Sequence, residues 1–261
     1  MKERIAVAMS GGIDSSVAAA LLKRQGHDVV GLTARMWAEG SRCCSDEDIR
    51  AAQRAADALA IPHYVLDLHD AFESKVVAYF VAEYAAGRTP SPCALCNRYV
   101  KFGLLLDKAV ALGASRLATG HYARLLKDSH GVLHLLKGLD EDKDQSYFLF
   151  DLSQDQLSRS LFPLGGMLKQ RVRQLAEDHG LPLTPRGESQ DLCFVPPGEH
   201  HLVVEKRRPS VRAPGRIVDM KGRDVGIHAG IHRFTVGQRR GLNVALGKPV
   251  YVVALDADEN M

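Results

Sequence analysis

The sequence predicts an α/β protein in which a parallel sheet is covered by helices on both faces. Short apolar runs alternate with longer helical patterns through the first 120 residues. Turns with paired small or polar residues follow two of the apolar runs, at Gly11-Gly12 and at Gly120-His121. Ligands of such sheets bind beyond the carboxyl ends of the strands, where we expect both turns to lie.

The strands and helices of this sheet can be assigned in order along the chain. We expect strands at residues 5–9, 29–33, 63–68 and 116–119, each a short apolar run. Helical patterns lie between them, at residues 17–25, 46–60, 71–86 and 97–112. Gly26 and Gly113 follow the first and the last helix, and Ser45 caps the second, with Asp48 in its first turn.

After Tyr122 the pattern changes. We expect a hairpin through Leu125 and residues 133–136, mostly helix over 154–179, and a basic helical stretch that ends at Arg208. From Arg212 onward, short apolar runs alternate with glycines, which indicates a small, incomplete β domain with a strand over 250–255. We therefore expect one domain over residues 1–198 and a basic second domain over 199–261.

Charge and cysteine content narrow the classes of protein. The net charge is +3, but residues 201–261 hold 11 Lys and Arg against 6 Asp and Glu, which favours a polyanionic partner such as RNA. Met1-Lys2-Glu3-Arg4 precedes only five apolar residues, and no stretch approaches the length of a membrane span. We expect a cytoplasmic protein without membrane contact, whose five cysteines are reduced, metal-bound or catalytic.

The segment 10–16, Ser-Gly-Gly-Ile-Asp-Ser-Ser, joins the first expected strand to the first helix. Backbone N–H groups and the positive end of a helix would surround an anion there, most simply the phosphate tail of a nucleotide. No GKS or GKT follows, so γ-phosphoryl transfer with a Walker A lysine is not indicated. The loop resembles that of enzymes that cleave ATP between the α and β phosphates. An ordinary strand-to-helix turn is the alternative.

The cysteines form a second group. Cys93 and Cys96 stand at the amino terminus of the helix predicted over 97–112, where a thiol pKa is lowered and either nucleophilic chemistry or metal binding is favoured. Half of a structural zinc site, completed by Cys43 and Cys44, is the alternative, although adjacent cysteines rarely converge on one ion. Cys193 lies far away in the sequence and could be a small buried apolar residue.

Several blocks together resemble the bacterial tRNA-specific 2-thiouridylases, the MnmA family. In order, they are residues 10–16 (SGGIDSS), Met36 within 34–37 (ARMW), 92–102 (PCALCNRYVKF), 119–123 (TGHYA), 143–149 (KDQSYFL), 188–194 (ESQDLCF) and 232–242 (HRFTVGQRRGL). The resemblance implies an adenine nucleotide alpha hydrolase-like fold with a PP-loop, and ATP-dependent thiolation of the wobble uridine in lysine, glutamate and glutamine tRNAs. Residues 1–198 would be catalytic and 199–261 RNA-binding.

The resemblance also implies roles for individual residues. ATP would contact Ala8, Met9, Ser10, Gly11, Gly12, Ile13, Asp14, Ser15, Met36 and Gly120, and Asp14 is the expected partner of Mg²⁺. Contacts with tRNA are expected from Ser91, Pro92, Cys93, His121, Lys143, Asp144 and Gln145. By their charge, further RNA contacts are expected from Lys206, Arg207, Arg208, Arg212 and Arg216, and also from Asn97, Lys101, Arg239 and Arg240.

Sulfur transfer is expected to use Cys96 and Cys193. Either Cys193 carries a persulfide from a donor protein and Cys96 releases it, or Cys93, Cys96 and Cys193 hold a [4Fe-4S] cluster that binds sulfide. Many family members have aspartate where this chain has Cys93, and they continue into a carboxy-terminal β-barrel, so this chain is a fragment or a short form. Another adenylating ligase or amidotransferase, and a non-catalytic zinc-containing RNA-binding module, are the alternative functions.

Overall fold

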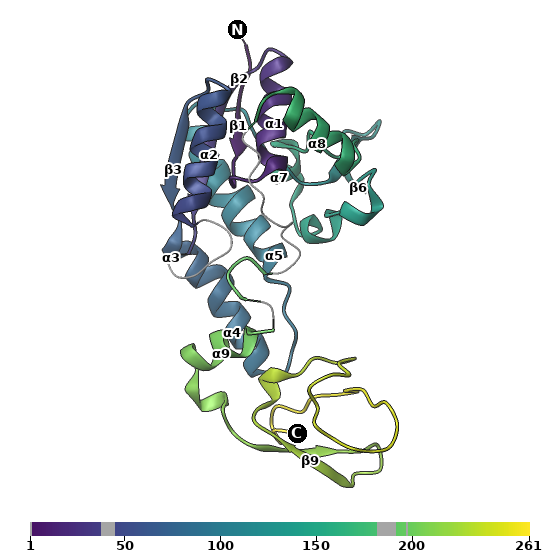
Figure 1. Ribbon diagram of the computed structural model, residues 1–261. Helices are drawn as coiled ribbons and strands as arrows, with labels where there is room; N and C mark the ends of the chain where they lie inside the picture. Colours follow the sequence, from purple (N-terminus) through teal and green to yellow (C-terminus); the bar gives the residue numbers. More distant parts are fainter. Residues whose placement is uncertain (1, 38–44, 182–191, 197) are drawn as a thin grey trace. The chain divides into compact units, whose positions relative to one another are not determined.

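A computed structural model describes residues 2–37, 45–181, 192–196 and 198–261 (Figure 1). The chain divides into two compact units. Unit 1 comprises Met1–Lys75 and Cys93–Phe194, and unit 2 comprises Val76–Pro92 and Val195–Met261. No helix in these described ranges is long and apolar enough to cross a membrane.

Unit 1 is built on a parallel sheet, as the sequence predicts, but the sheet has five strands, and β7 is added to the four that were expected. The strand order is β3-β2-β1-β4-β7. The strands are β1 (Arg4–Ala8), β2 (Asp28–Arg35), β3 (His63–Asp67), β4 (Arg116–Ala118) and β7 (Ser160–Leu161). The order runs outward from β1 to β3 and then returns to β4 on the other side of β1. This reversal places the loops after β1 and β4 at the topological switch point, where such sheets bind ligands.

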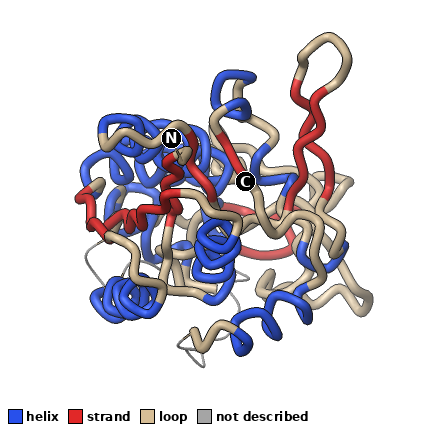
Figure 2. Tube along the Cα trace, turned by 90° about the horizontal axis from the view of Figure 1, so that it is seen from above, coloured by secondary structure: helices blue, strands red, loops and turns tan. Residues whose placement is uncertain are grey.

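Helices cover both faces of this sheet (Figure 2). The helix α1 (Ile13–Arg24) packs against β1, β2, α2 (Asp46–Ala58) and α8 (Lys169–Asp178), and every residue from Ser15 to Leu22 is buried. Right-handed crossovers place α1 and α2 on one face of the sheet and α6 (Leu106–Ala111), which packs against β4, on the other. The expected Ser45 cap of α2 is confirmed, because the side chains of Ser45 and Asp48 form a reciprocal capping box.

The two predicted helices between β3 and β4 are confirmed as helical, but both contain π-helical turns. The first is formed by α3 (His69–Phe72), η1 (Glu73–Val77) and α4 (Ala78–Ala85), and the second by α5 (Pro92–Leu95), η2 (Cys96–Leu105) and α6 (Leu106–Ala111). Turns of π-helix are rare and frequently occur at functional sites. Here Cys96 is the first residue of η2.

The remainder of unit 1 confirms the predicted hairpin and corrects the helix that follows. Strands β5 (Ala123–Lys127) and β6 (Leu133–Lys137) pair Leu125 with Leu135. The short turns η3 (Glu141–Lys143) and η4 (Ser146–Leu149) come next. The helix expected over 154–179 is wrong in its middle, where α7 (Gln154–Ser158) is followed by β7 and a turn up to α8. Pro163 and Gly165 break the helix, and Gly165 lies against the Ala123 carbonyl with no room for a side chain.

Unit 2 contains α4, α9 (His200–Arg207), the turns η5 (Pro209–Val211) and η6 (Ile231–Arg233), and the hairpin of β8 (Gly215–Val218) and β9 (Asp224–His228). The basic helical stretch is confirmed. The strand expected over 250–255 is wrong, because residues 250–255 are not assigned to a strand. Only Val252 makes paired backbone hydrogen bonds there, with Gly237 and Gln238. Gly237 has a φ of 89°, so the partner segment is not extended at this residue.

The interior of unit 2 holds one buried carboxylate, Glu205, whose side chain is 3% exposed. It accepts hydrogen bonds from Arg212 Nε at 2.7 Å and Arg233 Nη2 at 2.5 Å, and it lies 3.0 Å from Nε2 of His232. Burial alone would raise the pKa of Glu205, but these partners outweigh it and lower the pKa to about 2. The Glu205 cluster, meaning Glu205 with His232, Arg233 and Arg212, thus ties α9 to the turns η5 and η6.

Candidate active site

The loop between β1 and α1 has the form of an anion-binding loop. The helix α1 begins at Ile13, four residues before the predicted start, so Asp14 and Ser15 lie in its first turn. Its N-cap is Gly12, which makes no side-chain cap, so the first N–H groups of the helix are left to an acceptor from outside. Gly11 has a φ of 77°, and the Asp48 carbonyl leaves no space there for a side chain. Only glycine fits this position.

Internal hydrogen bonds fix the shape of the loop. The Ser15 hydroxyl accepts from the Ser10 N–H at 3.2 Å and donates to the Gly12 carbonyl at 3.1 Å. At the end of β1, the Met9 carbonyl accepts a hydrogen bond from the Thr33 hydroxyl at 2.7 Å. Ala8 is the last residue of β1, and Ile13 is half-buried at the start of α1. Hydrogen bonds within the loop and to β2 therefore fix its conformation.

Gly120 brings the end of β4 against this loop. A Cβ atom at Gly120 would lie 2.8 Å from the Asp14 carbonyl carbon and 2.8 Å from the Ser15 nitrogen, so any larger residue would push the loop away. Both turns that the sequence placed at the carboxyl ends of strands lie there, and they are in contact. The predicted position of the two turns is therefore confirmed, and that they bind a ligand stays a prediction.

Asp14 has two partners that sequence reasoning missed. Lys169 Nζ lies 2.7 Å from each of the Asp14 carboxylate oxygens, and the Tyr122 hydroxyl donates to Oδ1 at 2.8 Å. The lysine side chain is 11% exposed, whereas the Asp14 side chain is 33% exposed. In the sequence Lys169 is one lysine in a polar helix, a pattern typical of a solvated face, and Tyr122 falls within the block 119–123 without a distinctive spacing.

Met36 contacts one of the thiols. It is buried after β2, and the Cys96 thiol donates a weak hydrogen bond to its sulfur at 3.9 Å. The expected contact of Met36 with adenine therefore stays a prediction. The described cysteines Cys93, Cys96 and Cys193 are not joined by disulfide bonds. Negative charge on Cys193 raises the pKa of both Cys93 and Cys96.

The thiol pKa values differ from the prediction. The helix amino terminus was expected to lower them, but burial raises the pKa of Cys93 and raises that of Cys96 to about 12. Lys101 opposes burial at both thiols and is the principal cation acting on them. Among the described side chains, no group of three or more His, Cys, Asp and Glu has the geometry of a metal site. Cys43, Cys44 and residues 188–191 lie outside the described residues.

His121 is neutral and fixed. Burial lowers its pKa well below the ordinary value, and Lys101 lowers it further. Its Nδ1 lies 2.6 Å from the Thr119 hydroxyl, and its ring packs beside the rings of Phe102 and Phe162, which also contact each other. The side chain is half-buried, so this imidazole can donate or accept one hydrogen bond without carrying charge.

The segment 143–145 holds its own backbone in place. Burial would raise the pKa of Asp144, but hydrogen bonds from the N–H of Gly138 at 2.8 Å and from Ser146 lower it. Gln145 accepts from the Tyr122 N–H at 3.1 Å, while Lys143 is half-buried at the end of η3. Asp144 and Gln145 thus hold neighbouring backbone in place, as expected if this block serves the fold instead of binding RNA.

The other residues expected at RNA differ in accessibility. Asn97 is buried and donates to the Phe148 carbonyl at 2.8 Å, and Arg212 and Arg216 form ion pairs with Glu205 and Asp224. Ser91 precedes α5 and Pro92 is its first residue. Arg208, Arg239 and Arg240 are exposed.

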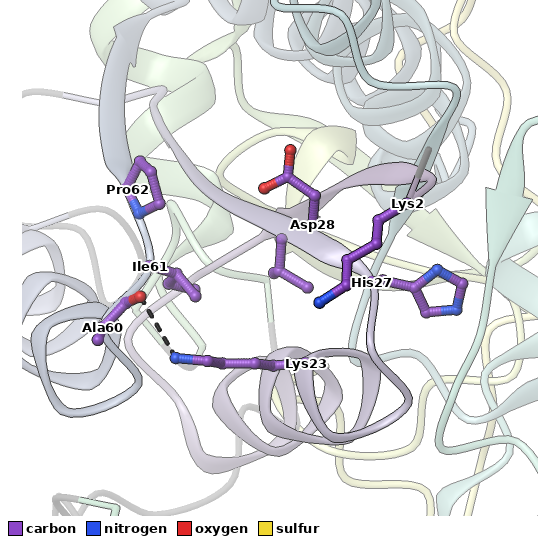
Figure 3. Close-up of a pocket in the computed structure, with 8 residues that line it drawn as sticks. Lys2, Lys23, His27, Asp28, Ala60, Ile61 and Pro62 are labelled. Carbon is purple, nitrogen blue, oxygen red and sulfur yellow. Dashed lines mark hydrogen bonds between the residues drawn. The ribbon is translucent and has the colours of Figure 1, made fainter.

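A hollow at the opposite end of the sheet is a separate feature. Lys2, His27 and Asp28 line it near the amino ends of β1 and β2 (Figure 3). There Lys23 donates hydrogen bonds to the carbonyls of Leu59 and Ala60, at the end of α2. Lys23 thus satisfies carbonyl groups at a helix terminus, and the hollow lies away from the loops that follow the strands.

Comparisons with known proteins agree with this geometry. Residues 3–197 match the family model of the tRNA methyl transferase HUP domain, and residues 203–261 match that of the tRNA methyl transferase PRC-barrel domain. The chain is 50% identical over 266 residues to the tRNA-specific 2-thiouridylase MnmA of Geotalea uraniireducens (strain Rf4), covering 98% of this chain and 71% of that protein. It is also 50% identical over 269 residues to the MnmA of Heliobacterium modesticaldum (strain ATCC 51547 / Ice1), covering 100% and 70%.

Among solved structures, the U34-tRNA thiolase NcsA from Methanococcus maripaludis, described with its [4Fe-4S] cluster, is 18% identical with a TM-score of 0.47. The match covers 80% of this chain and 67% of that one. This likeness is too low to carry over residues or ligands.

The parallel sheet, the switch-point loop and the matching domain define an α/β enzyme with a PP-loop HUP domain. The chain belongs to the family of tRNA-specific 2-thiouridylases, as its sequence blocks indicated. The predicted class of enzyme, a tRNA sulfurtransferase, is confirmed by this membership.

Proposed function

We propose that this chain activates C2 of the wobble uridine of tRNA with ATP and replaces its oxygen by sulfur. Family membership supports tRNA as the substrate, and we expect the lysine, glutamate and glutamine tRNAs to be accepted. One observation carries the proposal. The phosphate-type loop and the thiols Cys93, Cys96 and Cys193 belong to the same unit, and the Cys96 thiol contacts Met36 at the carboxyl end of β2.

Activation is the first step. The C2 oxygen attacks the α phosphorus of ATP, the bond between the α and β phosphates breaks, and diphosphate leaves. The N–H groups at the start of α1 would hold the negative charge that develops on the phosphates. Asp14, Ser10 and Ser15 are the residues that would hold a Mg²⁺ ion, whose contribution is to neutralise phosphate charge. The partly exposed Asp14 carboxylate fits this role in charge and accessibility.

Sulfur arrives in the second step, from a donor protein or as sulfide. In the persulfide route, Cys96 thiolate attacks the sulfur of Cys193, the bond to the terminal sulfur breaks, and hydrosulfide leaves. The hydrosulfide adds to C2, and AMP departs with the former C2 oxygen. A Cys96–Cys193 disulfide remains, which an external dithiol reduces. Because burial raises the pKa of Cys96, Lys101 is the group that would stabilise its thiolate.

A [4Fe-4S] cluster is the other route for sulfur. Three thiols are suitable donors for iron, but in the described geometry they do not form a metal-binding group. We therefore expect the Cys93→Ala variant, assayed with a persulfide donor, to keep a measurable thiolation rate without bound iron. Iron and zinc analysis of anaerobically purified protein is the measurement. Joint loss of iron and 2-thiouridine in Cys93→Ala would establish the cluster route instead.

The two predicted domains would have different roles, one in catalysis and one in tRNA binding. We propose that residues 1–198 carry the chemistry and that exposed basic residues of 199–261, such as Arg208, Arg239 and Arg240, hold tRNA phosphates. His121 and Lys143 would lie near the target nucleotide. The descriptions of the matched family models mention methyl transfer, whereas the loop without a Walker A lysine and the curated relatives support ATP-dependent thiolation. We expect the protein to act in the cytoplasm.

The deciding experiment measures diphosphate release and 2-thiouridine, the latter by mass spectrometry of digested tRNA. We expect diphosphate release only when tRNA is present. Cys96→Ser and Cys193→Ser should each abolish thiolation while AMP still forms on tRNA. An adenylating ligase for small substrates would turn over ATP without tRNA, and a non-catalytic RNA-binding module would release no diphosphate. Undiminished thiolation by either serine variant would contradict both sulfur routes.

A further inference from the structure

We propose that Lys169 binds the phosphate chain of the nucleotide, and that Asp14 holds this lysine ready when no nucleotide is present. The inference rests on the nucleotide site proposed above and deepens it. Lys169 lies 155 positions after Asp14 in the sequence, so the fold alone brings the ammonium group to the loop. Lys169 lies outside the sequence blocks that resemble the family.

The position of Lys169 is determined by its backbone. It is the first residue of α8, and its N–H donates to Asp140 Oδ2 at 2.8 Å. The helix α8 packs against α1, the helix that begins at the loop. The side chain therefore projects from a fixed point, and its ammonium group reaches both oxygens of Asp14.

Charge explains why the loop requires such a group. The segment 10–16 contains no lysine or arginine, and its charged residue, Asp14, carries the same sign as a phosphate. A phosphate chain placed at the start of α1 would meet an unfavourable carboxylate unless a cation stood beside it. Lys169 is such a cation, and it reaches the loop from α8, whereas a Walker A loop carries its own lysine.

The surroundings allow the lysine to change partners. The Tyr122 hydroxyl donates to Asp14 Oδ1, so this carboxylate keeps a hydrogen bond when Lys169 leaves. The ammonium group also lies 5.7 Å from the centre of the Tyr122 ring, whose face attracts a cation and keeps it near the loop. Asp14, one third exposed, would then be accessible to Mg²⁺ while Lys169 contacts phosphate oxygens.

A purely structural ion pair between α8 and α1 is the competing explanation. It predicts lower thermal stability for Lys169→Gln but an unchanged preference among phosphates. It also predicts that Asp14→Asn weakens the site for every ligand. Our proposal predicts the opposite for Asp14→Asn, because removing the carboxylate charge frees Lys169 and removes repulsion.

The test is equilibrium binding of ATP, AMP and inorganic diphosphate to the full chain without tRNA, with the melting temperature of each variant measured alongside. We expect Lys169→Gln to lose affinity for ATP and diphosphate by on the order of 10- to 100-fold, with AMP changed by less than about threefold. Lys169→Arg should retain most of the affinity for ATP. Arg171→Gln is the matched control, because Arg171 lies on the same helix with an exposed side chain.

Asp14→Asn supplies an independent readout that does not depend on the lysine variants folding. Without Mg²⁺, this variant should bind diphosphate more tightly than the wild type. Equal or weaker binding, or wild-type affinity of Lys169→Gln for ATP, overturns the proposal. If the wild type itself binds no ATP, the proposed function fails and the assignment of Lys169 fails with it, whereas an unaffected Lys169→Gln leaves the proposed function standing.

Discussion

Asp14 in unit 1 and Glu205 in unit 2 are both carboxylates held by basic side chains, yet they differ in exposure. The Asp14 side chain is 33% exposed and is held by one lysine and one tyrosine hydroxyl. Glu205 is 3% exposed and is held by two arginines and a histidine that lie on η5, η6 and their flanks. An ion pair of a carboxylate with basic side chains thus occurs once at a partly exposed loop and once in the interior of a unit.

This difference in exposure indicates that one carboxylate serves function and the other serves stability. The Asp14 carboxylate is open enough for water to solvate it, so a cation can replace Lys169 beside it at a lower cost than in a fully buried pair. In a buried pair, each charge left without its partner carries a large desolvation penalty. We infer that Asp14 serves nucleotide binding and that Glu205 maintains the fold of unit 2.

The largest expected effect is on activity at the open pair. Asp14→Ala should lower tRNA-dependent diphosphate release by at least about 10³-fold, because the Mg²⁺ partner at the phosphates is lost. Binding of tRNA, measured by filter binding, should change by less than about threefold. Survival of diphosphate release in this variant would show that Asp14 is not part of the phosphate site.

The buried pair should respond in stability instead. Glu205→Gln leaves Arg233 and Arg212 without a counter-charge and should lower the free energy of unfolding of unit 2 by about 3 kcal/mol. Hydrogen exchange at the amides of α9 reports this unit separately from unit 1. Glu199→Gln, at an exposed position just before α9, is the matched control and should change exchange little. Unchanged protection of α9 in Glu205→Gln would contradict the structural role.

Lowering the pH should also destabilise unit 2, because Glu205 loses its charge when it is protonated. The pKa of Glu205 lies at about 2 in the folded protein, below its ordinary 4.5, so its stabilisation is complete above pH 4.5 and disappears between about pH 4.5 and 2. Burial also lowers the pKa of His232, so the imidazole resists protonation in the folded state and some stability is lost from about pH 6.5 downward. Protection of α9 should fall by about 2 to 3 kcal/mol over this range, and Glu205→Gln should remove the part below pH 4.5.

The sequence predicts what is local and misses what the fold assembles from distant segments. The loop at 10–16 and the first four strands follow from short patterns, and all of them are present. The two-residue strand β7 has no such pattern, because pairing with β4 rather than its own apolar content creates it. Lys169 and Asp14 could not be paired from spacing, since 155 residues separate them.

Burial is the other property that the sequence did not reveal. A CxxC motif at a helix start predicts acidic thiols, but Cys96 is enclosed by its surroundings and its pKa rises to about 12. Likewise, Asn97 and Arg212 have the chemistry of RNA contacts, but one is buried and the other is paired with Glu205. Residue type suggests a role, and burial or an existing partner decides whether the residue is available for it.

The smallest expected effect distinguishes two arginines of the predicted basic surface. Arg212→Ala should cost unit 2 about 1 kcal/mol, because the arginine is largely exposed and Glu205 keeps His232 and Arg233. Since its charge is already paired, the loss of tRNA affinity should be small. Arg208→Ala, at an exposed position after α9, should instead leave stability unchanged and reduce the salt dependence of tRNA binding by about one phosphate contact. Measuring the tRNA affinity of both variants at several salt concentrations separates these roles. An equal fall in the salt dependence of both variants would show that Arg212 contacts tRNA although it is paired with Glu205.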